Sequence, residues 1–189
     1  LGSAGAALVI LSIEEALAEQ EPVVVPNEGS PDSPVWLLYT SGSTGKPKGV
    51  VQTNRNVLQY VGNYAQGLQI KPGDHYALLF SCAVNAGAHV IFSTLLNGAT
   101  LCVYDVRRRG LADLPAWLVE QQITLYASVP TLFRDWARAL DSHCRFPALR
   151  YLMMIGEPVY ARDLELYRSL PAPNCTLINR LGSTETGSI

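Results

Sequence analysis

The sequence TSGSTGKPKG at residues 40–49 directly follows a strand-length apolar run, VWLLY at residues 35–39. Its three glycines let the backbone turn and come close to a ligand, while four hydroxyl residues and two lysines supply donors and positive charge. This composition predicts a phosphate-binding loop. The loop differs from the Walker A motif of kinases and GTPases, because only two residues separate Gly42 from Gly45 and Pro47 stands where that motif has its Ser or Thr ligand for Mg²⁺.

Residue for residue, this loop resembles the T-S-G-[ST]-T-G-x-P-K-G signature of the adenylate-forming superfamily, which includes acyl-CoA synthetases, luciferases and nonribosomal peptide synthetase adenylation domains. The alternative is a Gly/Ser-rich linker, which the preceding apolar run disfavours. A second stretch, NRLGSTETG at residues 179–187, resembles the later Y-G-x-T-E motif of that superfamily. By itself it could be a strand followed by a polar turn. A third stretch, MMIGEP at residues 153–158, resembles the segment whose glycine lies against adenine, although a plain turn is an equal alternative.

The resemblance implies an acid–thiol ligase that uses ATP and Mg²⁺. A small carboxylic acid would be converted to acyl-AMP and pyrophosphate, and the acyl group would pass to coenzyme A or to the phosphopantetheine thiol of a carrier protein. By resemblance, the catalytic residues would be Thr184 at the α-phosphate, Glu185 as the Mg²⁺ ligand and Lys48. The nucleotide-binding residues would be Thr40, Ser41, Gly42, Ser43, Thr44, Gly45, Lys48, Gly156, Asn179 and Thr184.

An acyl pocket is also implied, by aligning LLNGA at residues 95–99 with the corresponding segment of the superfamily. The alignment places Asn85 where domains that activate α-amino acids usually carry an Asp to pair with the ammonium group. An Asn at this position resembles the pattern of domains that activate aryl acids, so we expect the substrate to be an acid without a free α-ammonium group. An equal alternative is that Asn85 caps the helix beginning at Ala86. Arg180 is either a cation of the pocket or an exposed residue at the end of a strand. The other pocket residues would be Ala86, His89, Ala127, Met153, Ile155, Arg180, Ser188 and Ile189.

From residue 35 onward, short apolar runs alternate with longer segments of helical period. This alternation predicts an α/β fold with a mostly parallel sheet flanked by helices, in which ligands bind beyond the carboxyl ends of the strands. Residues 1–34 are expected to form a helix at 13–20 and a Pro-rich connector, and residues 35–189 the nucleotide- and acyl-binding subdomain. The expected strands are 35–39, 76–80, 100–103, 125–128, 151–155 and 175–178, and the expected helices 54–67, 86–96, 111–121, 130–140 and 159–170.

Composition narrows the functional class. Hydrophobic residues make up 48% of the chain and charged residues 16%, which is too apolar for a disordered protein. Fourteen basic and sixteen acidic residues leave a charge of −2, so we expect no nucleic-acid or membrane partner. The four cysteines are widely spaced and lie in or near apolar runs, which predicts buried thiols in a reducing, cytoplasmic compartment and no zinc site.

In the superfamily, the ribose-binding Asp, the hinge and the lid domain with the adenylation Lys come after the position of Glu185. The resemblance therefore implies that these 189 residues are part of a longer enzyme, with the lid among their partners, and that they are inactive alone. The alternative is a non-catalytic nucleotide-binding or scaffolding fragment.

Overall fold

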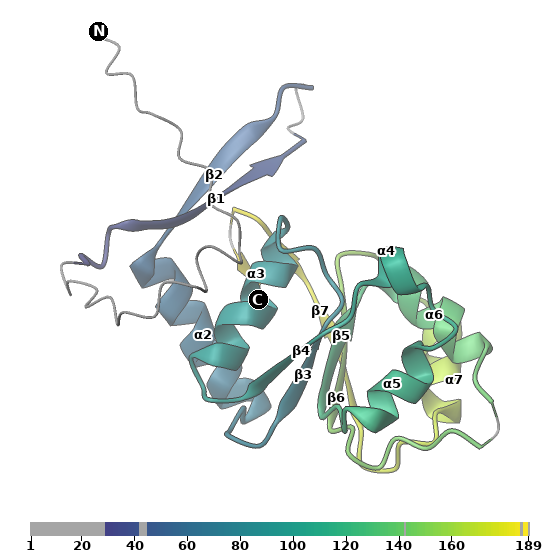
Figure 1. Ribbon diagram of the computed structural model, residues 1–189. Helices are drawn as coiled ribbons and strands as arrows, with labels where there is room; N and C mark the ends of the chain where they lie inside the picture. The colour runs from purple at the N-terminus through teal and green to yellow at the C-terminus, as the bar shows by residue number, and fades with distance from the viewer. Residues whose placement is uncertain (1–28, 42–44, 142, 186, 189) are drawn as a thin grey trace, which may run out of the picture.

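The computed structural model describes residues 29–41, 45–141, 143–185 and 187–188. Its centre is a five-stranded parallel sheet with the order β4-β3-β5-β6-β7, covered by helices on both faces (Figure 1). This arrangement confirms the predicted α/β fold. The strands are β3 (His75–Leu78), β4 (Thr100–Val103), β5 (Leu125–Ser128), β6 (Tyr151–Ile155) and β7 (Thr176–Arg180). The helices are α2 (Asn54–Leu68), α3 (Asn85–Leu95), α4 (Val106–Arg109), α5 (Leu114–Glu120), α6 (Pro130–Arg138) and α7 (Ala161–Ser169).

Two apolar cores lie on the two faces of the sheet, because side chains alternate along each strand. In β6, Leu152 and Met154 join the core beneath α5, α6 and α7, whereas Met153 and Ile155 join the core beneath α2 and α3. Strands buried on both faces read as continuous apolar runs, which is why they were predictable. Phe133 and Trp136 of α6 are fully buried, so these two aromatic side chains pack the helix against the sheet.

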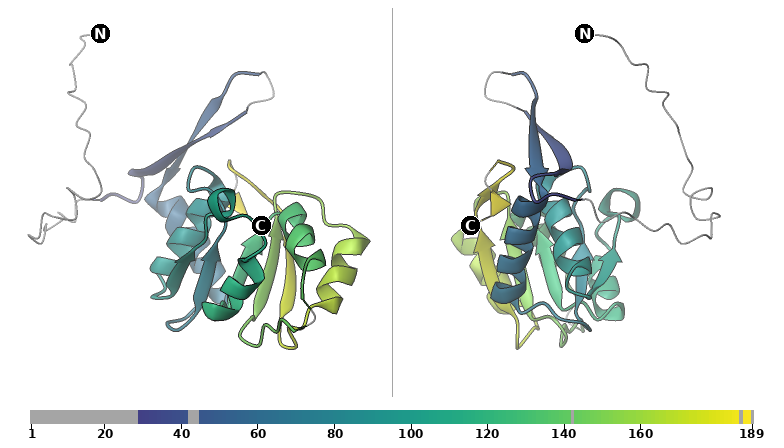
Figure 2. Two further views of the ribbon diagram at one scale, coloured as in Figure 1. Left: turned by 45° about the vertical axis from the view of Figure 1, so that its right-hand side comes forward. Right: turned by 90° about the vertical axis from the view of Figure 1, so that its left-hand side faces the viewer.

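The first apolar run belongs to a separate hairpin. β1 (Pro34–Thr40) pairs antiparallel with β2 (Lys48–Thr53), and the phosphate-loop motif connects them. A strand at 35–39 is thus confirmed, but its expected place in the parallel sheet was wrong. The physical reason is the length of the connection: residues 41–47 allow a hairpin, whereas a parallel crossover needs about a dozen residues or more. The hairpin projects from the α/β body beyond α2 and α3 (Figures 1 and 2).

Helix α2 begins where the sequence predicted and ends slightly later. Thr53 is its N-cap: Asn56 N donates to Thr53 Oγ1 over 3.4 Å, and Thr53 N donates to Asn56 Oδ1 over 3.1 Å. The expected stop at Gly67 was wrong, because the helix continues to Leu68 and is closed by Gln69 in the left-handed conformation at φ 47°.

Four further expectations need correction. Arg107–Arg109, expected in a loop, lie in α4, where Asp105 accepts hydrogen bonds from the backbone N–H groups of Arg107 and Arg108. The helix expected at 111–121 is shorter, since α5 begins only at Leu114. The last strand of the parallel sheet reaches Arg180, so Asn179 lies within β7 rather than after a strand. Cys82 is exposed because it lies in the β3–α3 loop, and of the four cysteines only Cys102 is buried.

A buried carboxylate holds the amino-terminal edge of the sheet, opposite the expected site. Asp74, 2% exposed, accepts hydrogen bonds from Arg150 Nη1 at 2.6 and 2.8 Å and from Thr124 Oγ1 at 2.9 Å. Arg150 also donates to the Leu68 carbonyl at the end of α2, over 3.2 Å. These bonds connect the segments that lead into β3, β5 and β6.

The helix predicted at 13–20 lies outside the described residues. In the part of the chain that is described, no helix is both long enough and apolar enough to cross a membrane.

Candidate functional site

Two hydrogen bonds bring distant parts of the chain to the carboxyl edge of the sheet. Gln52 Nε2 in β2 donates to the backbone carbonyl of Thr184 over 2.9 Å. Asn85 Nδ2, in the first turn of α3, donates to the backbone carbonyl of Ser183 over 3.3 Å. The strand leaving the phosphate loop, the start of α3 and the second motif therefore meet at one place, as expected for the end of the strands where ligands bind.

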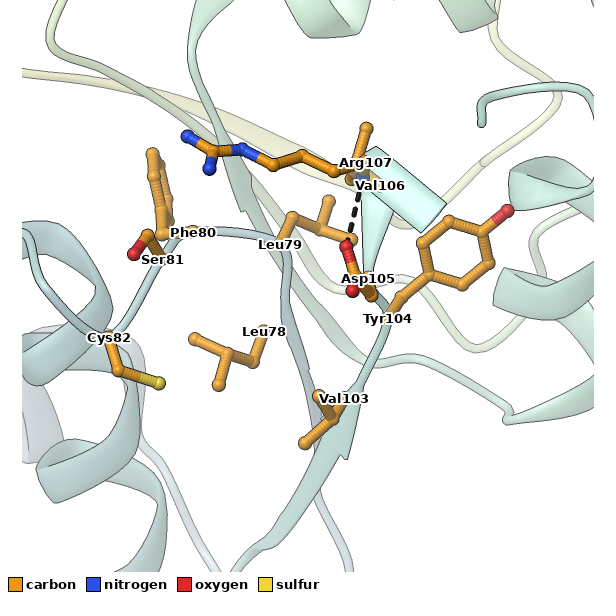
Figure 3. Close-up of a pocket in the computed structure, with 10 residues that line it drawn as sticks. All are labelled: Leu78, Leu79, Phe80, Ser81, Cys82, Val103, Tyr104, Asp105, Val106 and Arg107. Carbon is orange, nitrogen blue, oxygen red and sulfur yellow. Dashed lines mark hydrogen bonds between the residues drawn. The ribbon is translucent and has the colours of Figure 1, made fainter. Parts of the chain in front are cut away.

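A pocket of about 490 Å³ opens at the same edge, beyond β3, β5 and β6. It brings together Ala86 and Ile155, predicted for the acyl pocket, with Gly156, predicted for the nucleotide. A neighbouring pocket of about 330 Å³ lies between the β3–α3 loop and the β4–α4 turn (Figure 3). Ser81 and Arg107 line both pockets, so the two form adjoining parts of one depression.

The predicted acyl-pocket residues gather on one face of the sheet. Ala127, Met153 and Ile155 belong to the core that α2 and α3 cover, and Arg180 pairs in register with Ile155 on the neighbouring strand. Asn85, Ala86 and His89 lie along the first two turns of α3 on the same side. The alignment with the superfamily thus picked residues of four elements that lie on the same side of the sheet. Three of them have little access to solvent, since Ala127 and Met153 are fully buried and His89 is 3% exposed.

Asn85 does not cap α3. Val84 occupies the N-cap position, so the expectation that Asn85 caps a helix starting at Ala86 was wrong. The Asn85 amide instead donates across to Ser183, and its Oδ1 is buried with no hydrogen-bond partner among the described residues. A buried acceptor without a donor costs free energy, on the order of 1–3 kcal/mol, which a ligand group that donates a hydrogen bond would recover.

Aromatic side chains of α2 pack against His89, one turn after Asn85 in α3. The rings of His89 and Tyr60 are stacked with centroids 3.8 Å apart, and Tyr64 meets His89 edge-on at 6.0 Å. The guanidinium carbon of Arg180 lies 3.5 Å from the centroid of the Tyr64 ring. Burial lowers the pKa of His89 to about 4, so its imidazole is neutral at pH 7, and burial lowers the pKa of Arg180 to about 10, so its guanidinium remains charged.

The residues predicted to touch the nucleotide are spread over a wider area. Gly156 directly follows β6, and Asn179 is the next-to-last residue of the neighbouring β7. Gly156 adopts a φ of 87°, a left-handed conformation that favours glycine. Thr184 is half-buried and Glu185 exposed in the segment that Gln52 contacts. Lys48 pairs with Thr40 at the end of the hairpin next to the loop, and among the described residues no hydrogen bond or ion pair joins either of them to Thr184 or Glu185.

Glu185 is the acidic side chain predicted to bind a metal ion. In the described ranges, no three His, Cys, Asp or Glu side chains are grouped so that they could hold one. An exposed Glu185 therefore offers a single hard oxygen ligand, and a Mg²⁺ ion there would complete its shell with phosphate oxygens and water. That donor set fits a magnesium–nucleotide complex rather than a metal bound by protein alone.

The sequence profile of the AMP-binding enzyme family matches residues 5–189. The chain belongs to this family. A human protein named acetyl-coenzyme A synthetase 2-like, mitochondrial, is 28% identical over 193 residues, which cover 94% of this chain and 27% of that protein. The acetyl-coenzyme A synthetase of Chlorobaculum tepidum is 30% identical over 190 residues, covering 92% of this chain and 27% of that protein. Among solved structures, the AMPPNP-bound nonribosomal peptide synthetase FmoA3 has a TM-score of 0.75 at 27% identity, over 83% of this chain and 17% of that one.

The chain spans about 27% of the length of these curated relatives. Its described fold is that of part of the large N-terminal region of adenylate-forming enzymes. Membership in the AMP-binding enzyme family confirms the resemblance that the two motifs indicated.

Sequence reasoning missed three residues near the candidate site. The rings of Tyr60 and Tyr64 of α2 pack against His89, but their spacing with Val57 and Leu68 marks them in the sequence only as an apolar helix face. Gln52 lies in the strand that was not predicted. No local signal distinguishes these residues from ordinary packing positions.

Several predicted residues of this AMP-binding enzyme cannot be placed. Gly42, Ser43, Thr44 and Ile189 lie outside the described residues, and Ser188 is described only as part of β9 (Gly187–Ser188), which pairs with β8 (Gly182–Ser183). Ser41 and Gly45 flank the undescribed part of the loop, and Gly45 has a φ of 76°.

Proposed function

We propose that the full-length protein activates a carboxylic acid by adenylation and transfers the acyl group to a thiol. A carboxylate oxygen of the acid attacks the α-phosphorus of ATP, and the bond between that phosphorus and the bridging oxygen of pyrophosphate breaks. The products are acyl-AMP and pyrophosphate. The thiol of coenzyme A, or of a carrier protein's phosphopantetheine arm, then attacks the acyl carbon and releases AMP.

The protein's task in such a reaction is to align the acid and to neutralise the charge that moves onto pyrophosphate. Ser41, Ser43, Thr44 and Lys48 would hold the β- and γ-phosphates, and Thr184 the α-phosphate. A Mg²⁺ ion, when bound through Glu185 and phosphate oxygens, supplies positive charge to the leaving group. Gly156 and Asn179, at the ends of adjacent strands, would flank the adenine.

The observation that carries the proposal is the hydrogen bond from Gln52 to the carbonyl of Thr184. It joins the strand that leaves the phosphate-loop motif to the segment that contains the second motif, which supports a single site formed by both motifs. The substrate class follows from Asn85, since a buried ammonium without a carboxylate partner is costly and a neutral amide offsets that cost only in part. We therefore propose an acid without a free α-ammonium. The acetyl-coenzyme A synthetases among the relatives bear names consistent with such an acid.

The test is ATP–pyrophosphate exchange by the full-length enzyme. We expect Lys48→Ala and Glu185→Gln each to lower kcat/KM by about ten- to a thousandfold, the scale for losing one charged contact to the transition state. Lys46→Ala provides the matched control, because Lys46 occupies the variable position of the same loop and should cost much less. Unchanged rates for both Lys48→Ala and Glu185→Gln would remove the phosphate-site assignment, and absence of exchange with every acid would favour a non-catalytic nucleotide-binding protein.

A further inference from the structure

Arg180 is a half-buried cation that has no carboxylate partner among the described residues. Within the same residues three ion pairs form: Arg55 with Asp32, Arg134 with Asp163, and Arg150 with Asp74. Arg134 and Arg150, the two partly buried members of that set, each reach an acidic side chain that is 2% exposed or less. In the described part of the chain, the guanidinium of Arg180 lies on the face of Tyr64. Its N–H donors therefore remain available to a ligand.

Arg180 lies beside residues of the proposed acyl site. Arg180 ends β7 beside Ile155, which lines the 490 Å³ pocket. Tyr64, on which the guanidinium lies, also contacts His89, one turn along α3 from Asn85. Two residues after Arg180 the chain enters the segment to which Asn85 donates its hydrogen bond.

Among the described residues that surround it, no side chain carries an opposite charge that balances Arg180. Asn85 carries no charge, His89 is neutral at pH 7, and Ile155, Tyr60 and Tyr64 are apolar or uncharged. A guanidinium held flat on an aromatic ring in a partly dehydrated site is already positioned, so it loses little freedom when it binds an anion. Its planar fork matches a carboxylate, with which it forms two parallel charge-assisted hydrogen bonds.

The depth of the site limits the size of the acid. His89, Ala127 and Met153, which would form the deep end, are buried, and the rings of Tyr60 and Tyr64 pack against His89. An acyl chain entering beside Ala86 and Ile155 would therefore meet Arg180 after a short distance. A long or aromatic chain would have to displace the stack.

We propose that Arg180 is a specificity residue that binds a second carboxylate, so that the acid adenylated by this enzyme is a short dicarboxylic acid. This inference rests on the proposed adenylation. One carboxylate attacks the α-phosphorus of ATP with release of pyrophosphate, while the other stays ionised and pairs with the guanidinium of Arg180 throughout. A monocarboxylic acid of equal length would leave Arg180 without its ligand.

The experiment compares acids that differ only in the second carboxylate. Pyrophosphate exchange by the full-length enzyme is measured with malonate against propionate, succinate against butyrate, and glutarate against valerate. We expect the unmodified enzyme to favour at least one dicarboxylate by about tenfold or more in kcat/KM. Arg180→Met, which keeps an apolar stem of similar reach, should lower that value by about ten- to a hundredfold, mainly through KM, the scale for truncating one charged hydrogen-bonded partner.

The monocarboxylate reactions are the comparison within each variant: in Arg180→Met, kcat/KM should fall about tenfold or more further for the dicarboxylate than for the monocarboxylate of equal length. Arg180→Lys, which keeps the charge but loses the fork, should retain an intermediate preference for the dicarboxylate. Direct calorimetric binding of the preferred dicarboxylate to the enzyme, with and without Arg180→Met, tests the contact separately from adenylation. Preference for monocarboxylates, or equal losses for both acid classes in Arg180→Met, would overturn the inference. Dicarboxylate binding that depends on Arg180, without exchange, would refute adenylation and leave the anion contact standing.

Discussion

Gly87 is the position at which one added methyl group should do most damage to the site. It lies in the first turn of α3, and a Cβ atom built on it would lie 2.1 Å from the carbonyl oxygen of Ser81. Cβ atoms essentially never approach other heavy atoms closer than 3.0 Å, so that carbonyl would have to move by about an ångström. Ser81 lies in the β3–α3 loop and lines both pockets at the carboxyl edge.

The size of the effect can be worked out for Gly87→Ala. Overpacking against a backbone atom, which cannot rotate away, costs about 2–3 kcal/mol, at the upper end of the usual range. Alanine returns about 0.5–1 kcal/mol through its greater helix propensity. The net loss in the free energy of unfolding should therefore be about 1–2 kcal/mol. Since displacing catalytic parts by about 1 Å can cost up to a hundredfold, kcat/KM should fall by about ten- to a hundredfold.

The assay combines urea unfolding with pyrophosphate exchange in the full-length enzyme. Gly62→Ala is the matched control, because Gly62 lies inside α2 and a Cβ there would meet nothing within 4 Å. That control should gain about 0.5–1 kcal/mol and keep kcat/KM within about twofold. If Gly87→Ala unfolds at the same urea concentration as Gly62→Ala and exchanges pyrophosphate as fast, the assigned contact between α3 and the β3–α3 loop is not real.

Asn85→Asp supplies a carboxylate at the position where an α-ammonium would need one. The ratio of kcat/KM for α-amino acids to kcat/KM for their deamino counterparts should therefore rise by about tenfold or more. An unchanged ratio in a pyrophosphate-exchange panel would argue against this location of the acyl group. Asp74→Asn should reduce the free energy of unfolding by about 1–3 kcal/mol at pH 7, because it weakens the bonds to Arg150 and Thr124. Burial opposes ionisation of Asp74, but these bonds outweigh it and lower its pKa. The contribution of ionised Asp74 to the free energy of unfolding is therefore complete above the unfolded-state pKa of about 3.9, and it is lost as the pH falls through the lower folded-state pKa. Urea titrations should show the stabilities of the variant and the unmodified protein beginning to converge below about pH 4. An equal difference at pH 7 and pH 3 would contradict this reasoning.

The sequence by itself determined the features that depend on neighbouring residues. The composition and spacing of residues 40–49 predicted a phosphate loop and indicated the family. Apolar runs located the buried strands, since a strand covered on both faces has little room for polar side chains. Thr53 at the start of α2 and Pro130 at the first turn of α6 were predictable because capping and proline geometry act within one helical turn.

Tertiary structure alone decided how those pieces form a site. The hydrogen bonds from Gln52 to Thr184 and from Asn85 to Ser183 join residues 132 and 98 positions apart, and nothing local to any of the four residues encodes them. Tyr60 and Tyr64 look in the sequence like core positions of an amphipathic helix, and only the packing of α2 against α3 brings their rings against His89. Such contacts depend on which surfaces bury each other when the chain folds, and a periodic pattern along one element carries no information about its partner.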